Sequence, residues 1–302
     1  MTEMNKQTVA AVVVTYNRLE LLKKCIQSLR DQTRKLDEII VVNNNSTDGT
    51  LEWLNSQNDL TVITQENSGS AGGQYTGIKT AYEKEYDWVW CLDTDIVVDK
   101  KALESFFTSE IIHDNNIGFL SSTIFYSDGS LANINIPFLG RDKNIVKTFV
   151  QYGELAIISA SFGSVLFPRQ VISKVGLPKK EFFIWGDDVE YSFRIIKAGY
   201  KGYLIRSSTA THFAPSNYED PYPELKINSL KMKFGIRNTV IILITRAEII
   251  YNQRYRGYIS AANFVFKVFY KRLKKSLSNI FDFFPLSFYF LKGIRCYSKW
   301  IH

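Results

Sequence analysis

The stretch Trp88-Val89-Trp90-Cys91-Leu92-Asp93-Thr94-Asp95 joins an apolar run to two carboxylates that stand one residue apart. The run predicts a buried strand, and its Asp-x-Asp ending projects both carboxylates from the edge of a sheet, where open α/β folds bind ligands. Burying ionised aspartate is costly unless a cation or hydrogen-bond donors compensate for it. Oxygen ligands suit Mg²⁺ or Mn²⁺, which proteins share with phosphates. The stretch therefore predicts either a cation that clamps a diphosphate or solvated aspartates at a strand-end turn.

Strands and helices alternate on the N-terminal side of this strand. Residues 9–14 and 38–43 form continuous apolar runs, as expected for parallel strands that are covered on both faces. Between them, apolar residues at helical spacing predict a helix over residues 20–32. Another helix is expected over residues 70–83. The alternation predicts a doubly wound, mostly parallel sheet up to about residue 100.

The pattern loosens after residue 100. Residues 118–125 and 156–167 are predicted as strands, and the turn-rich stretch 126–148 between them as a hairpin or an irregular insertion. A helix over 190–198 and a strand over 201–206 follow. From residue 225 onward the chain is predicted to be mostly helical.

Charge divides the chain into two unequal parts. The net charge is +7 over 302 residues, but residues 226–302 hold 15 Lys and Arg against two acids, which gives +13. The remaining 22 Lys and Arg and 28 acids give −6 over residues 1–225. A basic extension on an acidic body points to a polyanionic partner, either nucleic acid or an anionic membrane.

The cysteines and the N-terminus bear on the compartment. Cys25, Cys91 and Cys296 are widely spaced and odd in number, so they form neither a metal knuckle nor a disulfide framework. A reducing cytoplasm is therefore expected. The apolar run at residues 9–14 is too short for a secretory signal peptide.

Polar turns follow the first two predicted strands. Thr15-Tyr16-Asn17-Arg18 follows one, and the turn 43–49 follows the other, so both are expected at the same edge of the sheet. Their side chains can bind a base and a ribose, or they are ordinary capped β–α turns. The glycine-containing run 66–73 then opens a helix whose N-terminus favours an anion. It matches neither GxGxxG nor the Walker pattern.

Two later features carry chemistry. Asp187 and Asp188 precede a helix, where crowding and partial burial would raise the pKa of one carboxyl and suit it to proton abstraction. The alternative is a helix N-terminus that carries favourable acids. His212 is either a structural histidine or a further ligand beside the Asp-x-Asp pair.

In their order and spacing these pieces resemble the inverting, nucleotide-sugar-dependent glycosyltransferases of family 2, over about residues 8–215. Asn-x-Gly-x-Ala-Gly-Gly at 67–73 and the Trp-x-Asp-Asp pattern at 185–188 look most like its galactofuranosyl- and rhamnosyltransferase-like branch. Residues 233–238 also resemble an aromatic-x-x-Arg-Asn element of that branch. The matching segments are 13–18, 41–50, 66–73, 93–95 and 185–194.

The resemblance implies a GT-A fold, a Rossmann-like, mostly parallel sheet flanked by helices. A nucleotide-binding half would cover about residues 1–100 and an acceptor-binding half about 101–225, with a helical extension over 226–302. It also implies roles for individual residues. Donor-binding residues would be Thr15, Tyr16, Asn17, Arg18, Asn43, Asn45, Asp48, Asn67, Gly72, Gly73, Asp93 and Thr94. Acceptor-binding residues would be Trp185, Gly186 and Asp187, and catalytic residues Asp188 as base with Asp187.

Metal and base recognition complete the implied site. Asp95, Asp93 and His212 would hold Mn²⁺ or Mg²⁺. The family usually has Asp where this chain has Asn43, whose amide oxygen can still accept a hydrogen bond from uracil or thymine. A UDP- or dTDP-sugar donor therefore stays compatible with the sequence.

The expected reaction is a metal-assisted single displacement. It would move a sugar such as galactofuranose, galactose or rhamnose to a hydroxyl of a glycan or lipid-linked glycan in bacterial surface polysaccharide synthesis. A sugar-phosphate nucleotidyltransferase is one alternative, against which the weak phosphate loop argues. A nucleic-acid-binding protein is another, but it leaves both acidic motifs unexplained, so no nucleic-acid partner is expected.

The basic extension favours a membrane surface. In residues 263–277, cationic residues line one helical side and apolar residues another, as in helices that lie in a membrane interface. Residues 280–291 are too short to span a bilayer. These features predict a cytoplasmic protein, peripheral on the inner face of the cell membrane. The alternative is a helical subdomain or a homo-oligomer interface. The cationic residues are Lys267, Lys271, Lys274 and Lys275, and the apolar ones Val265, Val268, Phe269, Leu273 and Leu277.

Overall fold

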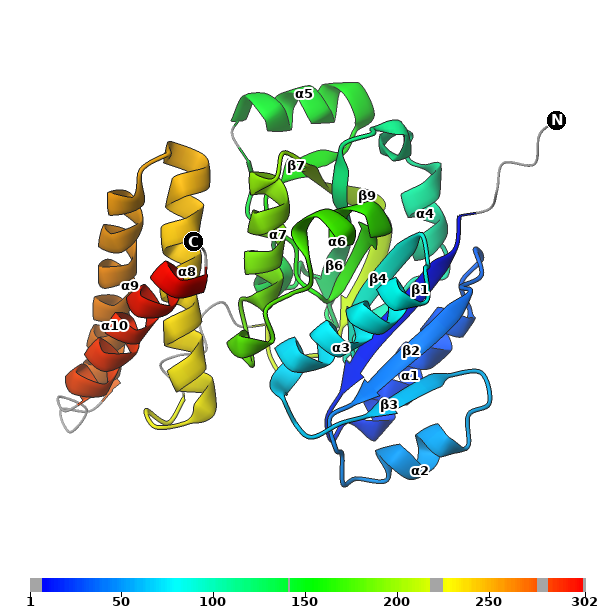
Figure 1. Ribbon diagram of the computed structural model, residues 1–302, viewed down its shortest axis with the longest axis horizontal. Helices are drawn as coiled ribbons and strands as arrows, with labels where there is room; N and C mark the ends of the chain where they lie inside the picture. Colours follow the sequence, from blue (N-terminus) through cyan, green and yellow to red (C-terminus); the bar gives the residue numbers. More distant parts are fainter. Residues whose placement is uncertain (1–6, 141, 218–224, 276–281, 301–302) are drawn as a thin grey trace.

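The computed structural model describes residues 7–140, 142–217, 225–275 and 282–300. An α/β body contains one sheet between two layers of helices, and three long helices form a group beside it (Figure 1). The expected GT-A-like architecture, a central sheet flanked by helices with a helical C-terminal region, is confirmed. The strand order in the described part of the chain is β3-β2-β1-β4-β8-β6-β9-β5, with β7 paired to β9.

The N-terminal half of the sheet is parallel. It consists of β3 (Thr61–Thr64), β2 (Glu38–Asn43), β1 (Val9–Thr15) and β4 (Trp88–Asp93). All seven residues of β1 are buried, as its apolar run predicts for a central strand. The register pairs Thr15 with Asn43 and Val14 with Asp93. The polar residues that follow these strands therefore meet at one edge of the sheet.

Antiparallel pairs enter the sheet beyond β4. β8 (Ser164–Pro168) is antiparallel to both β4 and β6 (Ile117–Tyr126), and β6 is parallel to β9 (Lys201–His212). β5 (Ile96–Val98) and β7 (Leu155–Ile157) are antiparallel to β9. β9 is longer than the predicted strand over 201–206, and its last residue, His212, pairs with Ile96. This pairing brings His212 beside the end of the Asp-x-Asp turn.

One prediction for residues 126–167 needs correction. The single strand predicted over 156–167 is two strands, β7 and β8, because Ser159 and Ala160 between them make hydrogen bonds outside the sheet. The hydroxyl of Ser159 accepts from the N–H of Phe138 at 2.8 Å, and the N–H of Ala160 donates to Ser192 at 3.1 Å. The stretch 126–148 contains a 3₁₀ turn, η2 (Asn133–Asn135), and the start of helix α5 (Asp142–Tyr152).

Helices cover both faces of the sheet, because alternate residues of β1 point to opposite faces. Ala11 and Val13 belong to the core under one layer, and Ala10 and Val12 to the core under the other. The first layer contains α1 (Leu19–Arg30), α2 (Thr50–Asn55) and α4 (Ala102–Thr108), followed by the 3₁₀ turn η1 (Glu110–His113). The second contains α3 (Gly69–Glu83), α6 (Arg169–Val175) and α7 (Asp187–Lys197), with the 3₁₀ turn η3 (Lys180–Phe182) before α7.

The C-terminal helices pack on one another and on the body. They are α8 (Leu230–Tyr251), α9 (Arg254–Lys275) and α10 (Phe283–Trp300). α8 contacts α7, and α9 lies on its far side (Figure 1). α10 crosses α8, and its last residue, Trp300, packs against Phe182 of the body. Buried residues of all three helices share a core with Ala71 and Phe182 of the body. No helix in the described ranges has the length and apolar character needed to cross a bilayer. Residues 276–277 and 280–281 of the predicted interfacial segments lie outside those ranges.

Candidate active site

Three strands and one helix start bring the predicted acidic residues and His212 to one edge of the sheet. Asp93 ends β4, Asp95 lies in the turn before β5, and His212 ends β9. Asp187 and Asp188 form the first turn of α7. The carboxyl of Asp188 acts electrostatically on that of Asp93, and Asp93 acts on Asp187. The two acidic motifs therefore face a common region, although more than 90 positions of sequence separate Asp95 from Asp188.

Asp95 stands at the centre of a polar cluster. Its Oδ2 forms an ion pair with the guanidinium of Arg18, and Nε2 of His212 lies 3.4 Å from the same oxygen. Nδ1 of His212 lies 2.8 Å from Oδ1 of Asn135, in the 3₁₀ turn η2. An amide oxygen accepts, so Nδ1 donates to Asn135, and this bond turns Nε2 toward Asp95. Nothing in the sequence pattern pointed to Asn135, because it comes from a stretch without clear periodicity.

The two carboxyls of the Asp-x-Asp motif differ in acidity. Burial and the neighbouring charge of Asp95 raise the pKa of Asp93 to about 7, against the opposing effect of His212. Burial would also raise the pKa of Asp95, but the hydrogen bond and charge of His212, with Arg18, lower it below its ordinary value. Asp95 is therefore the ionised member of the pair, and Asp93 holds a proton over part of the neutral range.

Asp187 and Asp188 both have raised pKa values. Burial raises the pKa of Asp188 to about 6, although backbone N–H groups of Val189 and Phe162 stabilise its charged form. For Asp187, burial and the charge of Asp188 raise the pKa well above the ordinary value. Oδ2 of Asp187 is buried without a hydrogen-bond partner among the described residues. Burial therefore disfavours the charged form of both carboxyls, and the backbone N–H groups make Asp188 the member of the pair whose charge is supported.

A strained loop precedes these two residues. Phe183, Trp185 and Gly186 have φ values of 65°, 61° and 86°, in the left-handed region that aromatic residues seldom adopt. Nδ2 of Asn238, on α8, lies 2.7–3.0 Å from the carbonyl oxygens of Phe182, Ile184 and Trp185. The adjacent Arg237 donates to the carbonyls of Glu181 and Phe182 at 2.8 and 3.1 Å. The aromatic-x-x-Arg-Asn element thus holds the backbone that leads into Asp187.

The rest of the Trp185–Arg194 motif is structural. Glu190 is buried and forms an ion pair with Arg194, with 2.9 Å between Oε2 and Nη2. Arg194 also donates to the carbonyl oxygens of Val175 and Leu177 at 2.7 and 3.1 Å. These bonds fasten α7 to the end of α6, and so they fix the helix that carries Asp188.

The turns after β1 and β2 are tied together by their own side chains. The N–H of Asn17 donates to Ser46 at 3.0 Å, and Oδ1 of Asn17 accepts from the N–H of Thr47 at 2.7 Å. Asp48 accepts from the N–H of Leu19 at 3.0 Å, so it caps the start of α1. The ring of Tyr16 is 48% exposed at the same edge. Tyr16 therefore offers a free face, whereas Asn17 and Asp48 shape the turns.

Three predicted donor-binding residues are buried beneath these turns. The hydroxyl of Thr94 donates to the carbonyl oxygen of Val14, and Oδ1 of Asn43 accepts from the N–H of Ser46 at 3.0 Å. Oγ1 of Thr15 and Nδ2 of Asn43 are buried without a partner in the described part of the protein. Buried polar atoms are nearly always paired, so unused atoms mark a site under special constraint. The contacts of these three residues with a donor stay predictions.

The glycine-containing run owes its composition to packing. A Cβ on Gly73 would lie 2.3 Å from Cγ1 of Val14, and one on Gly72 would lie 2.1 Å from Oγ of Ser68. Oδ1 of Asn67 accepts from the N–H of Gly69 at 3.0 Å, which closes the turn into α3. Asn45 has a φ of 61° and sits in the turn after β2. Close packing and turn geometry therefore account for these residues, and their donor-binding roles stay predictions.

The predicted set of three metal ligands does not come together. Among the residues that the structure describes, no group of three or more His, Cys, Asp or Glu side chains is placed to hold an ion. Asp95 turns toward Arg18 and His212, whereas Asp93 stays beside β1. Asp95 and His212 remain as an oxygen and a nitrogen ligand 3.4 Å apart. This pair fits Mn²⁺ or Mg²⁺ that takes its other ligands from phosphate and water.

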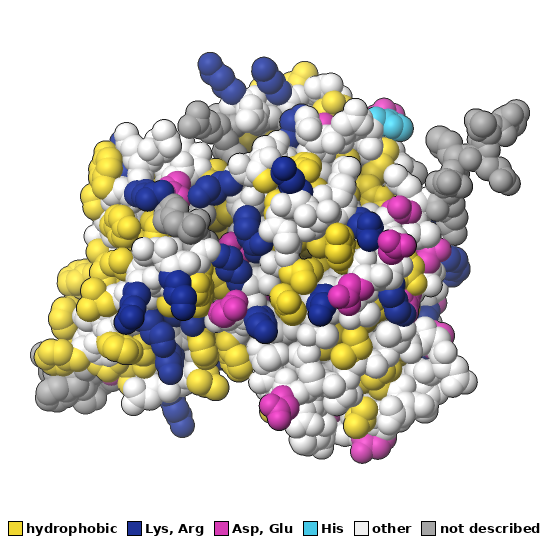
Figure 2. Space-filling model, viewed as in Figure 1, with side chains coloured by type: hydrophobic (Ala, Val, Ile, Leu, Met, Phe, Trp, Pro, Cys, Tyr) yellow, Lys and Arg dark blue, Asp and Glu magenta, His cyan; other side chains and the backbone are white. Residues whose placement is uncertain are grey.

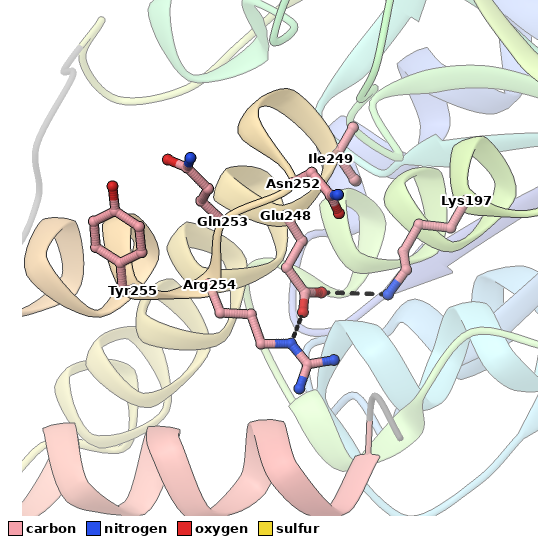
Figure 3. A pocket seen from close by; sticks show the side chains of 7 residues that line it. All are labelled: Lys197, Glu248, Ile249, Asn252, Gln253, Arg254 and Tyr255. Atoms are coloured by element: carbon pink, nitrogen blue, oxygen red, sulfur yellow. Dashed lines mark hydrogen bonds and ion pairs between the residues drawn. The ribbon is translucent and has the colours of Figure 1, made fainter.

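A pocket of about 650 Å³ lies away from the acidic residues, where α7 meets the connection between α8 and α9 (Figure 3). Glu248 lies between two cations, forming an ion pair with Lys197 at 3.3 Å and another with Arg254. The carboxylate is thus already neutralised within the protein. The pocket contains none of the predicted site residues, so we assign the chemistry to the sheet edge.

Comparisons with known proteins find similar chains among glycosyltransferases. The galactofuranosyltransferase GlfT1 of Mycolicibacterium smegmatis is 26% identical over 204 residues, 64% of this chain and 67% of that protein. GlfT1 of Mycobacterium tuberculosis (strain H37Rv) is 28% identical over 203 residues, 64% of this chain and 66% of that protein. The poly-beta-1,6-N-acetyl-D-glucosamine synthase of Staphylococcus aureus (strain COL) is 26% identical over 197 residues, 63% of this chain and 46% of that protein. The chain thus spans about two thirds of the galactofuranosyltransferases and less than half of the synthase.

The fold also has a solved counterpart. The crystal structure of GalNAc-T7 with UDP, GalNAc and Mn²⁺ superposes with a TM-score of 0.59 and 16% identity. The match covers 82% of this chain and 51% of that one, and at this identity it shows the fold alone. The sequence model of glycosyl transferase family 2 matches residues 10–172, which is more than half of the chain. This chain therefore belongs to glycosyl transferase family 2.

Proposed function

We propose that this protein is an inverting transferase that moves a hexose from a UDP- or dTDP-sugar to a hydroxyl of a glycan or lipid-linked glycan. The family is that of nucleotide-sugar-dependent glycosyltransferases, and two relatives are galactofuranosyltransferases. Galactofuranose, galactose and rhamnose are the sugars we consider first. The setting we propose is the synthesis of a bacterial surface polysaccharide, to which the synthase among the relatives also points.

One observation carries the proposal: the carboxyl of Asp188 is near enough to that of Asp93 to act on it electrostatically, and Asp93 in turn interacts with Asp95. In an inverting displacement the acceptor hydroxyl attacks the anomeric carbon from the side opposite the leaving diphosphate. Asp188, ionised above its pKa of about 6, would take the hydroxyl proton as the new C–O bond forms. The bond from the anomeric carbon to the diphosphate oxygen breaks, and the nucleoside diphosphate leaves with the electron pair. The acceptor side of this reaction lies at the start of α7, and the donor side at the ends of β1, β2 and β4.

Asp187 would hold the acceptor. Its raised pKa favours the protonated carboxyl, which would donate to one acceptor oxygen and accept from another hydroxyl. Trp185 and Gly186, in the strained loop beside it, would form the wall against which the acceptor sugar lies. A fixed acceptor next to Asp188 contributes to the rate by orientation.

Asp95 and His212 would hold a divalent cation. The GalNAc-T7 structure contains UDP and Mn²⁺, and the donor set in this chain fits Mn²⁺ or Mg²⁺. When bound, such an ion neutralises charge that develops on the departing diphosphate. Asn135 orients His212 for this task by accepting a hydrogen bond from its Nδ1–H. Arg18 places a further positive charge at the same edge.

Donor selection would involve the turns after β1 and β2. The exposed ring of Tyr16 suits stacking on a base, and Asn43 lies at the end of β2, where the family resemblance implies contact with the base. We also propose that the protein works at the inner face of the cell membrane, bound peripherally. A membrane site would give access to a lipid-linked acceptor.

A thermal-shift panel tests the donor class. UDP-, dTDP-, GDP- and CMP-linked sugars, and the nucleoside triphosphates UTP and dTTP, are added to the full chain with and without Mn²⁺, since a ligand that binds the native state raises Tm by mass action. We expect Tm to rise with the UDP or dTDP series only, and more with Mn²⁺ than without it. A rise of equal size with all four series, or a rise only with nucleoside triphosphates, would contradict the proposal. The second result would favour a nucleotidyltransferase.

A further inference from the structure

Helices α9 and α10 each expose an apolar stripe at helical spacing. On α9 the stripe contains Tyr255, Ile259, Phe266 and Tyr270, which are 49–61% exposed. On α10 it contains Phe284, Phe288 and Leu291, which are 60–73% exposed. Successive members lie three, four or seven positions apart, so each stripe follows one side of its helix. We call the two stripes together the bundle face.

The bundle face is not needed for the packing of the helices that carry it. Val265 and Val268 of α9 and Leu286 and Tyr289 of α10 are buried in the core shared with α8. Each helix therefore has one apolar side inside the protein and a second one in solvent. An exposed apolar surface of this extent on a soluble domain marks a surface for binding.

Positive charge accompanies the bundle face. Lys267 is exposed beside Phe266, and the ammonium of Lys274 lies 4.7 Å from the ring centre of Tyr270. Arg295 is exposed one helical turn beyond Leu291, on the same side of α10. Figure 2 shows hydrophobic and cationic side chains intermixed over the part of the molecule formed by these helices.

Negative charge in this region is already neutralised. The two acids between residues 226 and 302 are Glu248 and Asp282. Glu248 pairs with Lys197 and Arg254, and Asp282 pairs with Arg272. The excess of cations over residues 226–302 therefore has no acidic counterpart within the same helices. The partner of the bundle face must combine an apolar interior with anionic groups.

We propose that the bundle face docks on an anionic lipid surface, with its aromatic rings at the boundary between headgroups and acyl chains. The lysines would reach the phosphates of the headgroups, as long cationic side chains do at interfaces. None of the described helices can span a bilayer, so the helices would lie on the surface. The inference rests on the proposed function for its place in the cell and specifies which surface of the protein meets the membrane.

A second copy of the chain fits the same face less well. A symmetric contact would place Lys267 and Lys274 of one copy near the same residues of the other. Juxtaposed like charges oppose such a contact, whereas they favour an anionic membrane. α8 lies between α9 and the catalytic body (Figure 1), so a docked α9 stays clear of the start of α7.

Vesicle cosedimentation of the full chain tests the docking surface. Vesicles of phosphatidylcholine alone are compared with vesicles that also contain phosphatidylglycerol, at about 0.1 M and about 0.5 M salt. We expect binding to the anionic vesicles that weakens at high salt. The double variant F284E/F288E should lower the partition coefficient at least about tenfold. K267Q/K274Q should lower it about fivefold per charge removed, and only on anionic vesicles.

V146E/V150E is the matched control. Val146 and Val150 are 61% and 79% exposed, four positions apart on α5 and outside the bundle face, and the charge introduced is the same. Binding by this variant should equal that of the wild type. Thermal melting checks that every variant is folded. We expect all of them to fold, because the substituted side chains are exposed.

Two results would overturn the docking proposal. One is that the wild-type protein does not bind anionic vesicles, or that the F284E/F288E variant binds them as strongly as the wild type does. The other is a wild-type dimer in light scattering that F284E/F288E converts to a monomer, without vesicle binding by either form. The transfer reaction is assayed separately, with Asp188→Asn expected to bind vesicles like the wild type. Transfer without vesicle binding would refute the docking surface alone, and vesicle binding without transfer from any nucleotide sugar would refute the proposed function alone.

Discussion

At the scale of single residues, four carboxyl groups share one sheet edge but differ in acidity. Asp95 is ionised through His212 and Arg18, whereas burial raises the pKa values of Asp93, Asp187 and Asp188. Carboxyls whose environments push their pKa values apart can take different roles in one reaction. Here the ionised Asp95 suits charge neutralisation, and Asp188 suits proton abstraction near neutral pH.

The raised pKa values predict an acidic limb in the pH dependence of transfer. Asp188 must be ionised to act as a base, and its pKa is about 6, while that of Asp93 is about 7. We therefore expect kcat/KM to rise with pH up to about 6–7 and to level off above. Measuring kcat/KM between about pH 5 and pH 9 checks this, since a carboxyl of ordinary pKa would leave the profile flat over that range.

Asp187 should limit stability at neutral pH. Its raised pKa means that the folded state binds a proton that the unfolded state has released, so stability falls as pH rises above the unfolded pKa of about 4. We expect Asp187→Asn to raise Tm by at least about 2–4 °C at neutral pH and to change it little near pH 4.

For Asp114→Asn we expect a change in Tm of the opposite sign. Lys201 and Tyr203 lower the pKa of Asp114 against the opposing effect of burial, so this carboxylate stabilises the folded state at neutral pH. Its replacement should lower Tm. If Asp187→Asn also lowered Tm at neutral pH, the structure would have the environment of Asp187 wrong.

At the scale of elements, the loop before α7 depends on a helix that lies outside the sheet. Asn238 and Arg237 of α8 donate to the carbonyl oxygens of residues 181, 182, 184 and 185. On the other side, the N–H of Ala71 on α3 donates to the carbonyl oxygen of Phe183 at 3.2 Å. A loop with three positive φ values needs such support from both sides. The C-terminal helices thus help to position the proposed base.

Asn238→Ala should therefore reduce turnover more than donor binding. The variant leaves the carbonyl groups of Ile184 and Trp185 without their donor, whereas that of Phe182 keeps Arg237. A small shift of Asp188 lowers kcat, by about 10²-fold for 1 Å. Kinetics of transfer and the donor-induced shift in Tm measure the two effects separately.

Thr245→Val is the matched control for Asn238→Ala. Thr245 is equally buried on α8, but its hydroxyl bonds to the carbonyl of Ile241 within the same helix, at 2.9 Å. Comparable losses of turnover in both variants would mean that α8 supports only the fold.

Some elements could be predicted from the sequence and others could not. β1, β2 and β4 are continuous apolar runs, so their ends, and with them Asp93 and Asp95, could be placed at one sheet edge in advance. Asn135 lies in a stretch whose order comes from contacts with other segments, so no local pattern revealed its bond to His212. The glycines at 72 and 73 suggested a ligand loop, but their packing neighbours, Val14 and Ser68, become visible only in the fold.

At the scale of the whole molecule, the structure joins an acidic catalytic body to a basic helical group. The sequence predicted this division from charge alone, and the helices were expected from residue 225 onward. It could not predict which sides of α9 and α10 remain exposed, because both sides of each helix carry apolar residues. Only the packing against α8 separates the core side from the bundle face.

The most direct test of the central claim compares Asp95→Ala with Asp188→Asn in the same two assays. Donor binding is measured by the Tm shift with nucleotide sugar and Mn²⁺, and transfer by product formation. We predict that Asp95→Ala loses the metal-dependent donor shift, while Asp188→Asn keeps it and loses about 10²–10⁴-fold in turnover. Near-normal turnover by Asp188→Asn, or an unchanged metal-dependent shift in Asp95→Ala, would contradict the account.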